Sequence, residues 1–137
     1  MNKWVLGAIA AACVSSMSLA ATPSAADAKV SIVSPADGET VSSPVKVMFG
    51  AAGMEIVPAG IDKPNSGHHH LVIDGDVPDL SKAFPKDDTH IHFGKGQTDA
   101  TLTLAPGKHT LQLVLGDKDH MPHDKPVVSK KITITVK

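Results

Sequence analysis

Eight histidines stand out in this chain of 137 residues, which has three phenylalanines, one tryptophan and no tyrosine. Two pairs are spaced two residues apart, His68 with His70 and His90 with His92. Side chains at positions i and i+2 of a β-strand point to the same face, so each pair can offer two imidazoles to one ion. Imidazole is a ligand for copper, zinc, nickel and iron in proteins. The spacing therefore predicts a metal site.

A third group lies in a polar, proline-containing stretch after residue 116, where Met121 stands between His120 and His123. A proline-stiffened loop can hold ligands with little loss of conformational entropy. Thioether together with imidazole favours copper, particularly Cu(I). The single cysteine, Cys13, lies far upstream and argues against a zinc site built from thiolates. We expect copper first and zinc second. The candidate ligands are His68, His70, His90, His92, His120, His123 and Met121.

The elements that must position these histidines are strands. Short runs of Val, Ile, Leu and Thr are separated by Gly, Pro, Asn and Asp, which is typical of an all-β domain. We predict an immunoglobulin-like antiparallel β-sandwich of about seven strands, with at most one helical turn near residues 80–84. The expected strands cover residues 30–33, 45–49, 68–74, 90–93, 98–104, 109–115 and 127–136.

The up-and-down order of these strands predicts where the histidines gather. The strand at 68–74 should start at the end of the sandwich where the strand at 109–115 finishes, and the strand at 90–93 should return to that end. Seven of the eight histidines then lie at or near this end, and His109 starts at the other. His69 has the parity of Leu71, so it should face the core or its rim.

The first residues are typical of a secretory signal peptide, with Lys3 before an apolar run over residues 5–14 and then small residues. The run is too short to span a bilayer, which takes about 20 residues. We assign residues 1–28 to the leader, with cleavage after residue 20 as an alternative, and residues 29–137 to one domain without a membrane span. The protein is expected in the periplasm or outside the cell, and Cys13 raises a lipoprotein as a weaker alternative.

Composition excludes several classes of function. A formal net charge of −1 argues against a nucleic-acid-binding protein, which normally carries a basic face. The scarcity of aromatic residues disfavours a platform for stacking bases or sugars. Asp74, Asp76 and Asp79 lack the regular calcium-binding loop and its final Glu, so we interpret them as a turn.

A set of motifs spreads over nearly the whole predicted domain. The motifs are PNSGHHHL at residues 64–71, HIHFGKGQT at 90–98 and PGKHTLQL at 106–113, followed by Gly116-Asp117, His120 and Pro122-His123. Together they resemble the bacterial family catalogued as domain of unknown function 4399. The resemblance implies a small exported protein with a single domain, and it implies no biochemical role.

Three functions are consistent with these observations. The first is a periplasmic metal-binding protein that carries, buffers or confers resistance to copper or zinc. The alternative is a non-catalytic module for cell-envelope interaction or pH sensing, in which the histidines form a structural network and the partner is an envelope protein. A metalloenzyme with three histidines and Glu55 as base is the third, and no residue pattern beyond the ligands requires it. We therefore expect no enzymatic activity.

Overall fold

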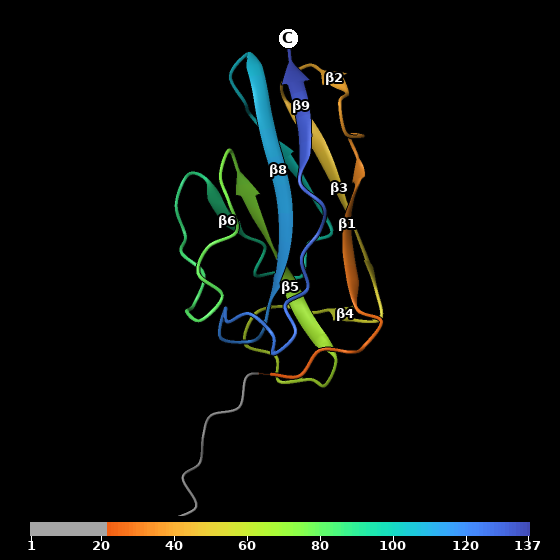
Figure 1. Ribbon diagram of the computed structural model, residues 1–137, viewed down its shortest axis with the longest axis vertical. Helices are drawn as coiled ribbons and strands as arrows, with labels where there is room; N and C mark the ends of the chain where they lie inside the picture. Colours follow the sequence, from red (N-terminus) through yellow and green to blue (C-terminus); the bar gives the residue numbers. More distant parts are fainter. Residues whose placement is uncertain (1–21) are drawn as a thin grey trace, which may run out of the picture.

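The computed structural model describes residues 22–137, which form two β-sheets and no helix (Figure 1). The described part of the chain has nine strands, so the predicted number of about seven was too low. The two additional strands, β2 and β4, are only two residues long. The strands are β1 (Lys29–Ser34), β2 (Thr40–Val41), β3 (Val45–Ala52), β4 (Glu55–Ile56), β5 (Ser66–Ile73), β6 (His90–His92), β7 (Asp99–Leu102), β8 (Gly107–Gly116) and β9 (Ile132–Val136).

The order of the strands confirms the immunoglobulin-like sandwich. One sheet has the order β1-β3-β7, and the other has the order β2-β9-β8-β5-β4, with β6 also pairing with β5. These are the positions of strands A-B-E and G-F-C in immunoglobulin domains. The sheets are not wholly antiparallel, because β2 pairs with β9 and β4 pairs with β5 in parallel. Residues 80–84, where a helical turn was conceivable, form turns and irregular structure.

The core lies between the two sheets and follows the predicted alternation. Val47 and Phe49 of β3 face Leu71 and Leu113 of the other sheet, and all are buried within one cluster. Full burial of such a side chain contributes about 1.5–3 kcal/mol. This apolar core fixes which face of each strand points outward, and so it fixes which histidines can meet.

Strand β5 occupies the centre of its sheet and is buried along its whole length. It pairs with β8 on one side, in a register that sets His68 opposite Gly116, and with β4 and β6 on the other. The loop after β8 therefore lies at the beginning of β5, at the lower end of the molecule in Figure 1. This confirms the predicted up-and-down order.

The described chain already contacts the sandwich before the first strand. Ala25 and Ala28 pack against the core cluster ahead of β1. The predicted cleavage position after residue 20 and the cysteine at position 13 lie outside the described residues. Among residues 22–137, no helix has the length and hydropathy needed to cross a membrane.

Candidate metal centre

Two imidazoles of the site come from the outer face of β5. Because side chains alternate along a strand, His68 and His70 project away from the core while His69 projects into it. The Nε2 atoms of His68 and His70 lie 2.8 Å apart, and both side chains are buried. His69 packs instead against the ring of Phe49, with ring centroids 5.0 Å apart, as its parity predicted.

The third imidazole comes from the loop after β8. His120 has a φ of 60°, which turns the chain back toward β5, and its Nδ1 lies 3.0 Å from Nε2 of His68. The buried Asp117 organises this turn: its Oδ1 accepts hydrogen bonds from the backbone N–H groups of Asp119 and Met121. Nothing in the spacing of Asp117 predicted this role.

These three residues have the spacing of a metal site. One ring nitrogen from each of His68, His70 and His120 lies within 4.8 Å of the others. Nitrogen ligands of a tetrahedral zinc ion, each about 2.0–2.1 Å from the metal, are about 3.3 Å apart. The short contacts at His68 are already near that separation, so small ring movements would admit an ion.

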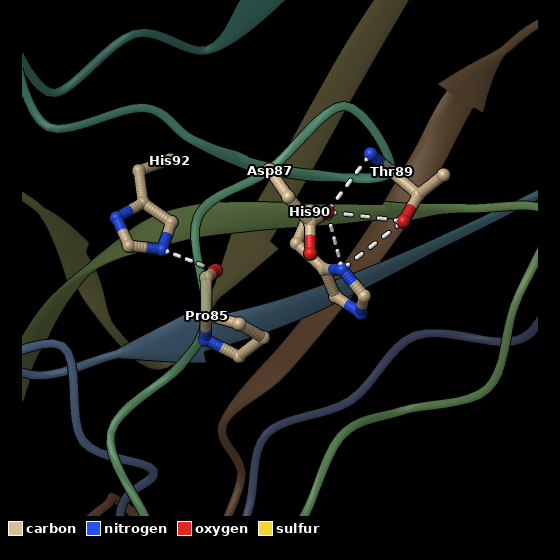
Figure 2. A network of polar contacts seen from close by, with 5 residues as sticks. All are labelled: Pro85, Asp87, Thr89, His90 and His92. Atoms are coloured by element: carbon tan, nitrogen blue, oxygen red, sulfur yellow. Dashed lines mark hydrogen bonds and ion pairs between the residues drawn. The ribbon is translucent and has the colours of Figure 1, made fainter.

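A fourth ring, from β6, lies against the other three. The ring centroid of His92 is 4.2 Å from that of His70 and 4.6 Å from that of His120, on which it stacks. Its Nε2 lies 2.8 Å from the carbonyl oxygen of Pro85, an acceptor that holds the ring at the edge of the cluster (Figure 2). We call His68, His70, His92 and His120 the histidine cluster.

The structure does not bring His90 into this cluster. The register of β6 on β5 sets His92 opposite His70 but His90 opposite Val72, two residue pairs further from the loop of His120. The His90 ring is bound at Nδ1 by the carboxylate of Asp87, 2.7 Å away, as Figure 2 shows. Sharing a strand face is therefore not sufficient to share a site.

His123 also lies apart from the cluster. Its Nε2 is 3.0 Å from the carbonyl oxygen of Ser66, and its ring lies 3.0 Å from where a Cβ of Gly67 would be. Gly67 has the parity of His69, so this ring approaches the opposite face of β5 from the one that carries His68.

Met121 is fixed through its backbone rather than through its sulfur. Its N–H donates to Asp117 and its carbonyl accepts from the N–H of the same residue. The residue lines a surface cavity of about 1080 Å³ together with His123, and the cavity lining does not include the β5 histidines. Within residues 22–137, no hydrogen bond joins its thioether to the histidine cluster.

Two further residues shape the site, although their spacing in the sequence did not predict it. The ring of Phe84 covers His70, with centroids 4.6 Å apart, and its N–H donates to the carbonyl oxygen of His120 at 2.8 Å. A Cβ atom at Gly116 would lie 2.5 Å from Nε2 of His70. Only glycine at this position leaves room for the imidazole.

The surroundings favour the neutral form of His68, His70 and His92. Burial first, and then repulsion from a positive charge on His68, His92 or His120, lower the pKa of His70 to about 2. Burial lowers the pKa of His68 to about 4, with the same repulsion from His120 and His92 and a smaller opposing effect of Asp117. Burial also lowers the pKa of His92. Neutral imidazole is the form that binds metal.

Hydrogen bonding alone leaves the β5 pair unsatisfied. If one ring donates through Nε2 to the other, the accepting ring must carry its proton on Nδ1. The Nδ1 atoms of His68 and His70 are both buried and have no hydrogen-bond partner among the described residues. An unpartnered buried N–H costs about 1–3 kcal/mol. An ion bound at the two Nε2 atoms would leave a proton on both Nδ1 atoms, so two buried N–H groups would lack a partner. The free energy of metal coordination, on the order of 10 kcal/mol in structural zinc sites, exceeds the cost of these two groups.

Comparison with known proteins supports the family and gives no function. No curated protein matches the chain. A solved structure of the Clostridium thermocellum CbhA fibronectin(III)-like modules is similar over 79% of this chain and 95% of that chain, at 14% identity and a TM-score of 0.39. The family model described as Domain of unknown function (DUF4399) matches residues 47–137, the part that contains all eight histidines. The chain therefore belongs to the DUF4399 family, as its motifs predicted.

Proposed function

We propose that this protein binds a metal ion in the periplasm, copper first and zinc second, through His68, His70 and His120. The observation that carries the proposal is the convergence of one nitrogen from each of these residues within 4.8 Å. Two of the three come from a central strand whose backbone is paired on both sides. The donors are therefore largely preorganised, which reduces the ordering cost of binding.

The donor set decides the order of metals. Imidazole suits both copper and zinc, and Cu²⁺ binds more tightly than Zn²⁺ at a given nitrogen site. His92 would supply a fourth nitrogen if its ring left the carbonyl of Pro85. The signal-peptide-like N-terminus supports a location in the periplasm, and a single small domain is consistent with carriage, buffering or resistance.

Metal titration of the purified protein tests the proposal. Cu(I) under anaerobic conditions, Cu(II) and Zn(II) are each titrated against a competing chelator, and melting temperature is followed in parallel. A ligand at a hundredfold excess over its dissociation constant adds about 2.7 kcal/mol, roughly 10 °C in a domain of this size.

Matched variants locate the site. We expect His68→Gln and His120→Asn to weaken binding by at least about a hundredfold, the upper range for residues that only support a ligand. Asparagine tolerates the positive φ of position 120, so that variant removes the ring and keeps the turn. His90→Gln, on the same strand as His92 but outside the cluster, should bind normally. If none of the three ions shifts the melting temperature, the proposal is wrong and the envelope-interaction alternative gains support.

A further inference from the structure

The segment that precedes β1 is bonded to the loop that carries His120. The hydroxyl of Thr22 donates to Oδ2 of Asp117 at 2.7 Å, and the carbonyl oxygen of Thr22 accepts from the N–H of Asp124 at 2.9 Å. The N–H of Ser24 donates to Oδ1 of Asp124 at 3.0 Å, and its hydroxyl donates to the carbonyl of Lys125 at 2.8 Å. The four contacts join positions about one hundred residues apart in sequence.

One carboxylate connects this segment to the metal ligand. Asp117 uses Oδ1 for the N–H groups of Asp119 and Met121, on either side of His120, and uses Oδ2 for Thr22. Its carbonyl oxygen also accepts the N–H of His120 at 3.0 Å. The conformation of His120 therefore depends on a residue whose second oxygen is held by the N-terminal segment.

The rest of the segment is built into the sandwich. Ala25 and Ala28 pack against the core, and the N–H of Ala28 closes a turn on the carbonyl of Ala25 at 3.1 Å. The backbone oxygen of Asp27 comes within 2.9 Å of where a Cβ of Gly53 would be. Removing residues 22–28 would expose apolar surface and leave the loop of His120 without these partners.

We propose that Thr22–Ser24 is a strap that positions His120, and that residues 22–28 belong to the mature domain. Of the two cleavage positions that the sequence allows, the strap requires one upstream of Thr22 rather than the one after Ala28. The positioning role rests on the proposed metal function, whereas the docking of the strap and the start of the mature chain do not.

The first test is the intact mass of the protein recovered after export of the full chain. A mass that corresponds to a chain beginning at or before Thr22 supports the proposal. A mature chain that begins at Lys29 overturns it, because the strap would then be discarded.

The second test is hydrogen exchange of the metal-free protein with the strap weakened. The double variant Thr22→Val/Ser24→Ala removes both side-chain hydroxyls and their hydrogen bonds to Asp117, Asp124 and Lys125. This should raise exchange of the 117–125 amides roughly tenfold and leave β8 unchanged. The conservative variant Thr22→Ser keeps a hydroxyl at this position. Exchange of the Asp119 and Met121 amides in this variant should therefore be as slow as in the wild-type protein. Thr40→Val, an exposed threonine in β2, is the matched control. If exchange of the 117–125 amides in the double variant equals that of the wild-type protein, the proposal that Thr22–Ser24 holds this loop is wrong.

Metal affinity separates the strap from the proposed function. If the wild-type protein binds copper, the double variant should bind more weakly while His68 and His70 are intact, and equal affinity overturns the positioning role. If the wild-type protein binds no ion but exchange responds as expected, docking of the strap stands and the metal function fails.

Discussion

The two ends of the β5–β8 pair each hold histidine, and they hold it in opposite surroundings. At one end lies the histidine cluster, in which His68 and His70 are buried and ring nitrogens face one another. At the other end Nδ1 of His109 is 2.7 Å from the carboxylate of Asp74, and Nε2 is 2.7 Å from the carbonyl of Ala105. Both of those partners only accept hydrogen bonds, so both nitrogens of His109 must carry protons.

The pKa values follow the same division. The pKa of His109 is raised, first by the hydrogen bond to Asp74 and then by the carbonyl of Ala105. The pKa values of His68 and His70 are lowered by burial and by neighbouring imidazoles. Hydrogen-bond partners therefore favour the protonated form of His109 at one end, whereas burial favours neutral imidazoles at His68 and His70 at the other. Partners, not residue type, decide whether a histidine is available to a metal.

The largest expected effect is acid destabilisation of the metal-free protein. His68, His69 and His70 keep pKa values of about 4, 4 and 2 in the fold, against 6.5 when unfolded. Below pH 6.5 the unfolded state takes up protons that the folded state refuses, so stability falls, by up to about 1.4 kcal/mol per histidine for each pH unit. The loss should continue until about pH 4 for His68 and His69 and until about pH 2 for His70.

Urea denaturation between pH 7 and pH 5 measures this loss. The variant His69→Phe, which fills the same space against Phe49, should reduce the slope by about one third because one of three equivalent protonations is removed. A stability that is flat over this range would contradict the neutral, buried state of these rings.

The next effect concerns Gly116. Alanine at this position would place a methyl group 2.5 Å from Nε2 of His70, so the imidazole must move and the cluster must open. We expect a loss of about 1–3 kcal/mol in stability and a marked loss of copper or zinc affinity. Gly75→Ala is the control, since its nearest neighbour, a side-chain atom of Val72, would be 3.7 Å away. Equal metal affinity in the two variants would show that His70 is not a ligand.

A smaller effect is expected at the opposite end. His109→Gln removes a partly exposed charged pair, which should cost about 1 kcal/mol. Because the folded pKa is raised, this stabilisation is fully present below pH 6.5 and is lost as pH rises through the folded pKa. Melting temperatures of wild type and variant should differ at pH 6 and converge at alkaline pH. Convergence at acid pH instead would mean that His109 is neutral in the fold.

The smallest effect is expected for Met121→Leu. Met121 lines the surface cavity, whose lining includes no member of the histidine cluster, and leucine preserves its apolar contribution there. Affinities for Cu(II) and Zn(II) should remain within a factor of about two, and stability within about 0.5 kcal/mol. A selective loss of Cu(I) affinity would instead make Met121 a ligand, as its sequence position suggested.

Alternation and turn residues were enough to predict most of the fold. Leu111, Leu113 and Leu115 lie fully buried as expected, and the predicted strand order brought His120 to the start of β5. The two-residue strands β2 and β4 were missed, because pairings so short leave no periodicity to detect. The last strand was predicted too long: β9 begins at Ile132, whereas Val127 and Val128 bond to β8 through isolated backbone contacts.

The site was predicted in part. Spacing identified His68 and His70 correctly as neighbours, because a strand's own geometry sets that relation. Spacing could not separate His90 from His92, since the register of β6 on β5 depends on tertiary pairing. The room that Gly116 leaves and the hydrogen bonds of Asp117 also depend on contacts between distant parts of the chain. A glycine directly after an apolar strand and ahead of two histidines was the one available signal.

The position of His120 on a loop has a kinetic consequence. His68 and His70 are fixed in the middle of a sheet, whereas His120 depends on a turn at positive φ and its few hydrogen bonds. An ion held by all three could leave when this turn swings outward, without any strand separating. A recipient could then take over coordination one nitrogen at a time, so exchange can be fast even where equilibrium binding is tight.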